Sequence, residues 1–223
     1  MRQGHLGALA FAIAVFLLGF AGTGRADNPE TDVCTQTACR EGGFDVAVSV
    51  DKEHYTTVPV SHSPYVLPDG AILVFPGETL VFELPVADGK TGTAKFVAEY
   101  APTMPVERDP NGPPAPVRDL PKLKGEMPEE ILAAFPEGTF IVSYGQLERG
   151  AGMCLMLMHN LPHNMKLDAV MSVIKPGKYE LHPTSTCPLK PKIFSLEHWP
   201  HLIGPMILKN IRILPDGADM RCE

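Results

Sequence analysis

The fold is decided by a stretch in which apolar and polar side chains alternate, Met165-Lys166-Leu167-Asp168-Ala169-Val170-Met171-Ser172-Val173. Successive side chains of a β-strand point to opposite faces, so this pattern predicts a strand with one dry face and one wet face. Such strands belong to antiparallel sheets, because parallel sheets are covered on both faces. The stretch therefore predicts an antiparallel β protein.

The same alternation recurs on both sides of this stretch, in segments 44–51, 79–86, 95–100, 139–144 and 210–213. Turn residues separate the segments: Pro and Gly occupy type II positions in residues 75–78 and 175–178, and Asp88-Gly89 favours a tight hairpin. Turns this short cannot carry parallel crossovers. We expect an antiparallel β-sandwich, jelly-roll or Ig-like, with a closed barrel as the alternative.

Residues 101–124 interrupt the pattern with seven prolines, which cannot donate to a strand ladder. We expect an extended excursion there, either a linker or a loop over the sandwich. One short helix is expected at 128–135, with Pro128 at its first position and Glu129 and Glu130 in its first turn.

The first 26 residues resemble an export signal. Arg2 precedes an apolar run from Leu6 to Ala21, and Gly24-Arg25-Ala26 offers small residues at a cleavage site. We expect a signal peptide at 1–26 and one β-sandwich domain at 27–223, in the periplasm or outside the cell. The alternative is an uncleaved anchor, because the run is near the short end of a membrane span.

The leader would remove two of the 19 basic residues and none of the 26 acidic ones, leaving a formal charge of −9. This acidic balance argues against nucleic acid, and against an anionic membrane once the leader is cleaved. A protein or a small ligand is the expected partner.

All five cysteines follow the leader, and export permits disulfides. One free cysteine and two bridges allow fifteen pairing patterns, and the sequence alone does not choose among them. Local setting gives a preference, because Cys154 lies in the apolar run 153–158 and the other four lie in polar segments. We expect Cys34–Cys39 and Cys187–Cys222 bridges with Cys154 free and buried.

Histidines are the candidate site residues. His159 and His163 fall in one expected loop, and His198 and His201 in another. Imidazole binds zinc and copper, and methionines flank the first pair, so convergence of the loops would form a copper or zinc site. A histidine pair in a loop lacks the fixed geometry of one on a helix, and ordinary loop histidines are the alternative.

The sequence carries no Gly-x-Ser-x-Gly elbow, phosphate loop or Cys-x-x-Cys pair. We expect an exported soluble protein with a binding or structural role rather than an enzyme. The alternatives are a periplasmic copper- or zinc-binding protein and a secreted metal-dependent enzyme using the loop histidines.

The leader gives the first prediction: the exported protein begins near Asp27, because cleavage follows the small residue Ala26. N-terminal sequencing and intact mass of the exported form measure this directly. A full-length product retained in the membrane would contradict it.

Overall fold

The computed structural model describes residues 33–100, 107–108, 136–147 and 152–222. The regular secondary structure of these residues is β-strand, apart from one 3-10 turn, η1, at Val33–Thr35. They belong to a single unit, Asp32–Glu223. The expected leader, the expected helix at 128–135 and most of the excursion at 101–124 lie outside the described residues.

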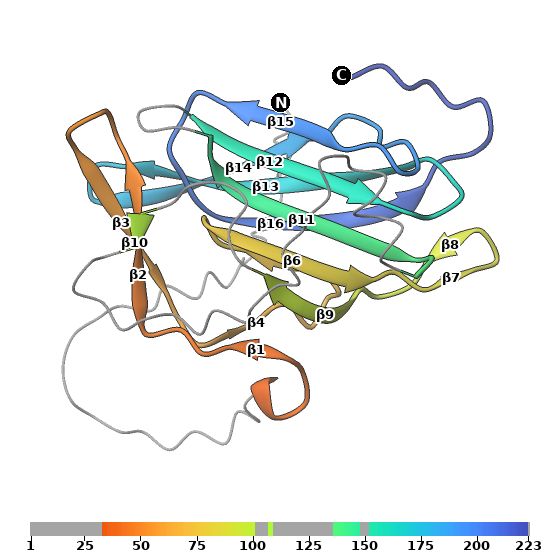
Figure 1. Cartoon of the computed structure of the whole chain (residues 1–223), viewed down its shortest axis with the longest axis horizontal. Coiled ribbons are helices and arrows are strands. Elements are labelled where there is room, and N and C mark those ends of the chain that lie inside the picture. The colour runs from red at the N-terminus through yellow and green to blue at the C-terminus, as the bar shows by residue number, and fades with distance from the viewer. Residues whose placement is uncertain (1–32, 101–106, 109–135, 148–151, 223) are drawn as a thin grey trace, which may run out of the picture. The chain divides into compact units, whose positions relative to one another are not determined.

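Two antiparallel sheets form the sandwich, which confirms the expected fold class. The five-stranded sheet has the spatial order β15 (Ser195–Trp199), β12 (Met153–His159), β11 (Thr139–Gln146), β6 (Glu78–Glu83) and β9 (Lys95–Tyr100). The four-stranded sheet has the order β14 (Lys178–Ser185), β13 (Met165–Lys175), β16 (Ile203–Ile213) and β5 (Ile72–Val74). Figure 1 shows the two sheets stacked, and both end on edge strands within the described residues, so the barrel alternative is not adopted.

Alternating side chains of the two sheets meet in one core, as the sequence pattern requires. The alternate apolar residues of β13 point inward and join the core, namely Met165, Leu167, Ala169, Met171 and Val173, whereas Val170 lies on the other face and is only partly buried. The Tyr144 hydroxyl of β11 crosses the core and donates toward the Ile203 and Gly204 carbonyls of β16, at 3.1 and 3.0 Å. The buried Tyr144 hydroxyl therefore links the two sheets by hydrogen bonds.

The short turns have the backbone that their residues favour. Pro176 and Gly177 join β13 to β14, and Gly177 has a φ of 73°. Asp88 and Gly89 join β7 (Val86–Ala87) to β8 (Lys90–Thr91), and both have positive φ, as a tight hairpin needs. The turn at 75–78 has a different task, because it carries the chain from β5 in one sheet to β6 in the other.

Three smaller sheets complete the described fold, one of which is the β7–β8 hairpin. A three-stranded sheet has the order β10 (Glu107–Arg108), β2 (Phe44–Ser49) and β3 (Tyr55–Val60), and a two-stranded ladder pairs β1 (Cys39–Arg40) with β4 (Ser63–Pro64). The Gln146 amide at the end of β11 accepts from the Ser49 backbone N–H at 2.7 Å and donates to its carbonyl at 2.9 Å. This side chain therefore acts as a strand partner for β2.

The expected cysteine pattern is confirmed. Disulfides join Cys34 to Cys39 and Cys187 to Cys222, and Cys154 is a buried free thiol. Two disulfides fit a protein outside the cytoplasm. Among the described residues, no helix has the length and apolar character needed to span a membrane.

A buried ion pair fixes the N-terminal segment on the sandwich. The Arg40 Nε and Nη2 atoms donate to the two Glu78 carboxylate oxygens at 2.7 and 3.1 Å. Burial raises the pKa of Glu78 to about 7, and the Arg40 guanidinium acts in the opposite direction. The guanidinium also lies over the rings of Tyr65 and Phe75, at 4.4 and 4.9 Å from their centroids.

The second prediction concerns this pair. Arg40→Met leaves the Glu78 carboxyl buried without its partner, which we expect to lower the free energy of unfolding by about 3–5 kcal/mol. The double variant Arg40→Met/Glu78→Gln replaces the unpaired carboxyl by a neutral amide and should recover part of the lost free energy of unfolding. Urea denaturation measures both.

The exposed pair Lys95–Glu83, at 3.2 Å, is the matched control. Lys95→Ala should change the free energy of unfolding by less than about 1 kcal/mol, because solvent screens exposed charges. An Arg40→Met loss no larger than the Lys95→Ala loss would show that the buried pair does not fix the segment.

Candidate functional site

The four candidate histidines do not come together in the described structure. His198 of β15 lies opposite Cys154 of β12, whereas His159 is the last residue of β12. Five residues of strand therefore separate the two positions, or about 17 Å. The side chains also face opposite ways, because His198 shares the outer face of the sheet with Cys154 and His159 points toward the four-stranded sheet.

His159 is a buried strand residue. Its imidazole is fully buried, its Nε2 lies 3.4 Å from the Leu189 carbonyl oxygen, and its Nδ1 has no hydrogen-bond partner among the described residues. Burial lowers the pKa of His159 to about 4. The ring is therefore neutral at physiological pH and packs as part of the sandwich interior.

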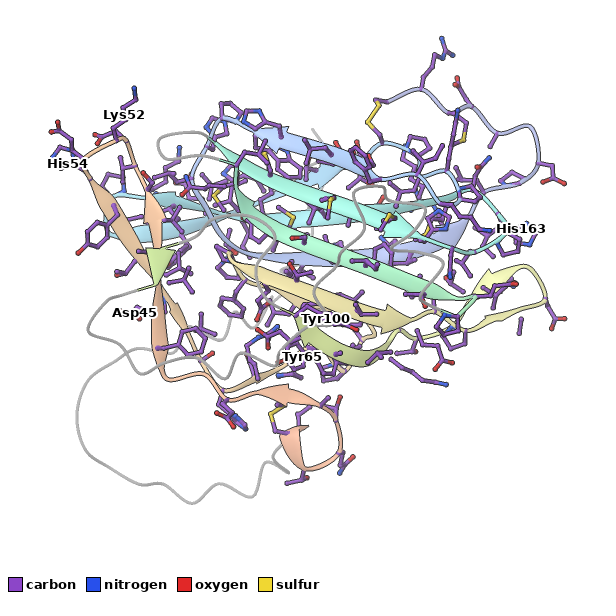
Figure 2. The ribbon with its side chains drawn as sticks, in the orientation of Figure 1. Asp45, Lys52, His54, Tyr65, Tyr100 and His163 are labelled. Carbon is purple, nitrogen blue, oxygen red and sulfur yellow. A yellow bond between two sulfur atoms is a disulfide. The ribbon has the colours of Figure 1, made fainter. Side chains whose placement is uncertain are left out.

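His163 is exposed in the loop between β12 and β13, where it borders a cavity. Figure 2 shows His163 at the same end of the sandwich as the β7–β8 hairpin. The cavity has a volume of about 670 Å³. Four separate segments line it: Val81 and residues 83–86, Val97, residues 136–139, and residues 161–163.

Hydrogen bonds between these segments hold the cavity walls. The Asn160 side chain accepts from the Thr139 N–H at 2.7 Å and donates to the Pro136 carbonyl at 2.6 Å. Leu84 N–H donates to the Gly138 carbonyl at 2.8 Å. Gly138 has a φ of 90°, which glycine adopts without strain. The walls are fixed by backbone and buried amide groups, so the cavity is pre-formed.

The lining is mostly apolar, with charge at the rim. Val86 and Val97 are its exposed apolar side chains, and Pro85, Pro136 and Pro162 lie beside them, whereas Leu84 and Leu161 also line it but are only 2% exposed. Glu83 and Glu137 are the acidic lining residues, and Glu83 pairs with Lys95 at the surface. A concave apolar site with a few polar groups is the usual form of a small-molecule site.

A second group of side chains has the chemistry of metal ligands. The sulfur atoms of Cys34 and Cys39 and a ring nitrogen of His62 lie within 4.8 Å of one another. The two sulfurs form the disulfide, and His62 is exposed. Among the described residues, this is the group of three such side chains whose ligand atoms lie close together.

Sequence reasoning identified one residue of the cavity, His163, and missed the rest. Prolines 85, 136 and 162 mark where chain segments turn at one end of the sheet, but nothing in the sequence shows that these ends meet. His62 was missed because it is a lone histidine 23 residues from Cys39, and only the pairing of β1 with β4 brings the two together. Comparison with known proteins adds no further assignment: no family model, curated protein or solved structure matches this chain.

The third prediction follows from the buried imidazole. The pKa of His159 is about 4 in the folded protein and about 6.5 when the chain unfolds, so the unfolded state binds more protons between these pH values. This residue should therefore lower the free energy of unfolding as pH falls from 6.5 to 4, by up to about 1.4 kcal/mol per pH unit. Urea denaturation across this range measures the slope.

The slope is read as the difference between the protein and His159→Gln. Glu78, with its raised pKa, acts in the opposite sense between about 4.5 and 7, and this contribution cancels in the difference. The exposed His163→Gln variant is the control and should keep the parent slope. Identical slopes in the parent and His159→Gln would contradict the buried neutral state.

Proposed function

We propose that this protein is an exported binding protein whose cavity takes a small apolar molecule carrying a positive charge. The observation that carries the proposal is the pre-formed cavity of about 670 Å³. Its volume falls within the roughly 300–1,000 Å³ of small-molecule sites. A periplasmic or extracellular location accords with the two disulfides and with the export signal expected at 1–26.

The acidic rim supports the choice of a cationic ligand. Glu83 and Glu137 are the acidic residues of a lining that also contains Thr139 and His163, and both carboxylates reach solvent. Lys95 pairs with Glu83, so Glu137 is the carboxylate available to a cationic ligand. A bound ammonium group near a carboxylate gains about 1 kcal/mol at 4 Å in water, which is about a fivefold gain in affinity. The apolar part of the ligand supplies the remaining affinity by leaving water.

The cavity favours binding over metal-dependent catalysis. A catalytic zinc site needs three converging ligands and one open position. The cavity offers His163, Glu83 and Glu137 from three different segments, and these do not form a cluster of ligand atoms among the described residues. The apolar walls are the larger feature, so contact with a ligand is the function they support.

The fourth prediction tests occupancy and charge preference. Nile red, an environment-sensitive apolar dye, should bind the protein with a rise in fluorescence, and ligands of equal chain length should displace it. We expect octylamine to displace the dye at lower concentration than octanol, and octanol at lower concentration than octanoate. Glu137→Gln should weaken octylamine binding about fivefold and leave octanol unchanged.

Val86→Trp identifies the cavity as the site. Val86 is 38% exposed, so a larger side chain can fill the cavity without entering the core. The control is Val50→Trp, at a similarly exposed position in the turn between β2 and β3. Loss of dye binding in Val86→Trp alone supports the proposal, and equal dye binding by both variants would overturn it.

A further inference from the structure

The exposed end of the β1–β4 ladder brings three soft-metal ligands together. The Cys34 and Cys39 sulfurs and a His62 ring nitrogen all lie within 4.8 Å of one another. Both cysteines are half-buried and His62 is exposed, so solvent and small reagents reach the group. Two thiolates and an imidazole are a zinc ligand set that leaves the fourth tetrahedral position open.

The backbone around these ligands is held by contacts other than the disulfide. β1 pairs with β4, and the Tyr65 N–H donates to the Ala38 carbonyl at 3.2 Å, directly beside Cys39. Arg40, the next residue, is anchored in the buried ion pair with Glu78. Breaking the sulfur–sulfur bond therefore leaves Cys39 in place.

The His62 side of the group is equally fixed. Gly42 has a φ of 67°, and a Cβ at this position would lie 2.2 Å from the backbone nitrogen of His62 and 2.1 Å from the carbonyl carbon of Ser61. Gly43 N–H donates to the Val60 carbonyl at 2.7 Å on the same pair of chain segments. The close approach that only glycine permits at residue 42 keeps the His62 backbone next to the cysteine loop.

We propose that Cys34, Cys39 and His62 form a zinc site when their disulfide is reduced, so that the disulfide and the metal are alternative states of one site. A dithiol donor gives two electrons and two protons to the disulfide: its sulfur–sulfur bond breaks, the donor becomes a cyclic disulfide, and two protein thiols form. Zn²⁺ then displaces both thiol protons and binds the two thiolates and the neutral imidazole. A disulfide oxidant reverses the change: it takes two electrons from the thiolates, its own sulfur–sulfur bond breaks and takes up two protons, the Cys34–Cys39 bond forms, and Zn²⁺ is released.

The second disulfide lacks this chemistry. Cys187 lies next to Glu197, whose carboxylate accepts from the Cys187 N–H at 2.7 Å and lies 3.8 Å from its sulfur. The group at Cys187 and Cys222 has no histidine ligand close by among the described residues. The two disulfides of the chain therefore differ in what they become on reduction.

The experiment uses the full-length mature protein with Cys187→Ser/Cys222→Ser, which removes the other reducible pair. The protein is reduced with dithiothreitol, desalted without oxygen, and titrated with Zn²⁺ against a chromophoric chelator. We expect one zinc per chain after reduction and none before it. The zinc affinity should decrease as the pH is lowered, because the thiols and the imidazole must lose their protons to bind the metal.

Two variants assign the ligands, and a third, His54→Ala, is their control. His62→Ala should weaken zinc binding at least tenfold, whereas His54→Ala, an exposed histidine in the turn between β2 and β3, should leave it unchanged. Cys34→Ser/Cys39→Ser in the chain that keeps Cys187 and Cys222 should bind no zinc after the same reduction, whereas the chain with all five cysteines should bind one zinc. This comparison answers the question if the first background fails to fold. Far-UV circular dichroism confirms folding of each variant.

Zinc bound equally by His62→Ala and the parent, or absent from both reduced and oxidised protein, would overturn the proposal. This site is separate from the cavity near His163, so Nile red binding and zinc binding succeed or fail independently.

Discussion

The structure depends on the buried guanidinium of Arg40. Besides the two Glu78 oxygens, it donates to the carbonyls of Pro64 and Leu73 at 3.0 and 2.9 Å, and to the Ser63 hydroxyl at 3.1 Å. A buried charge is costly unless all its donors are satisfied, and here four chain segments must be in place together to satisfy them. One of these segments is the turn that takes the chain from one sheet to the other. The pair thus links the folding of the N-terminal ladder to the closure of the sandwich.

The fold was predictable where local pattern and tertiary structure agree. Alternating segments became strands, and glycine at 77, 89 and 177 has the positive φ that its turn requires. The cysteine pairing followed because Cys154 lies in an apolar run whose neighbours are buried on both faces. In each of these cases the residues that decide the structure are neighbours in the chain.

The rest was not predictable, because it depends on contacts between distant segments. Strand β14 is mostly exposed and shows no alternation of buried positions. Strand β3 does bury Val58 and Val60 alternately, but Pro59 between them argues against a strand when only the sequence is read. Arg40 and Glu78 are 38 residues apart, and no pattern marks either as buried. Of the four expected site histidines, His159 lies in the interior and His163 at the cavity, which only the strand register decides.

The position of Cys154 has a consequence for how the chain matures. A chain with five cysteines can form wrong pairings while its disulfides form, and an odd thiol attacks disulfides of its own chain and of others. Cys154 has no exposed surface, and burial raises the pKa of its thiol, so the native fold withdraws it from exchange. The packing of β12 therefore protects the native disulfides. A substitution that loosens this strand would expose Cys154, and its first visible effect would be disulfide-linked dimers.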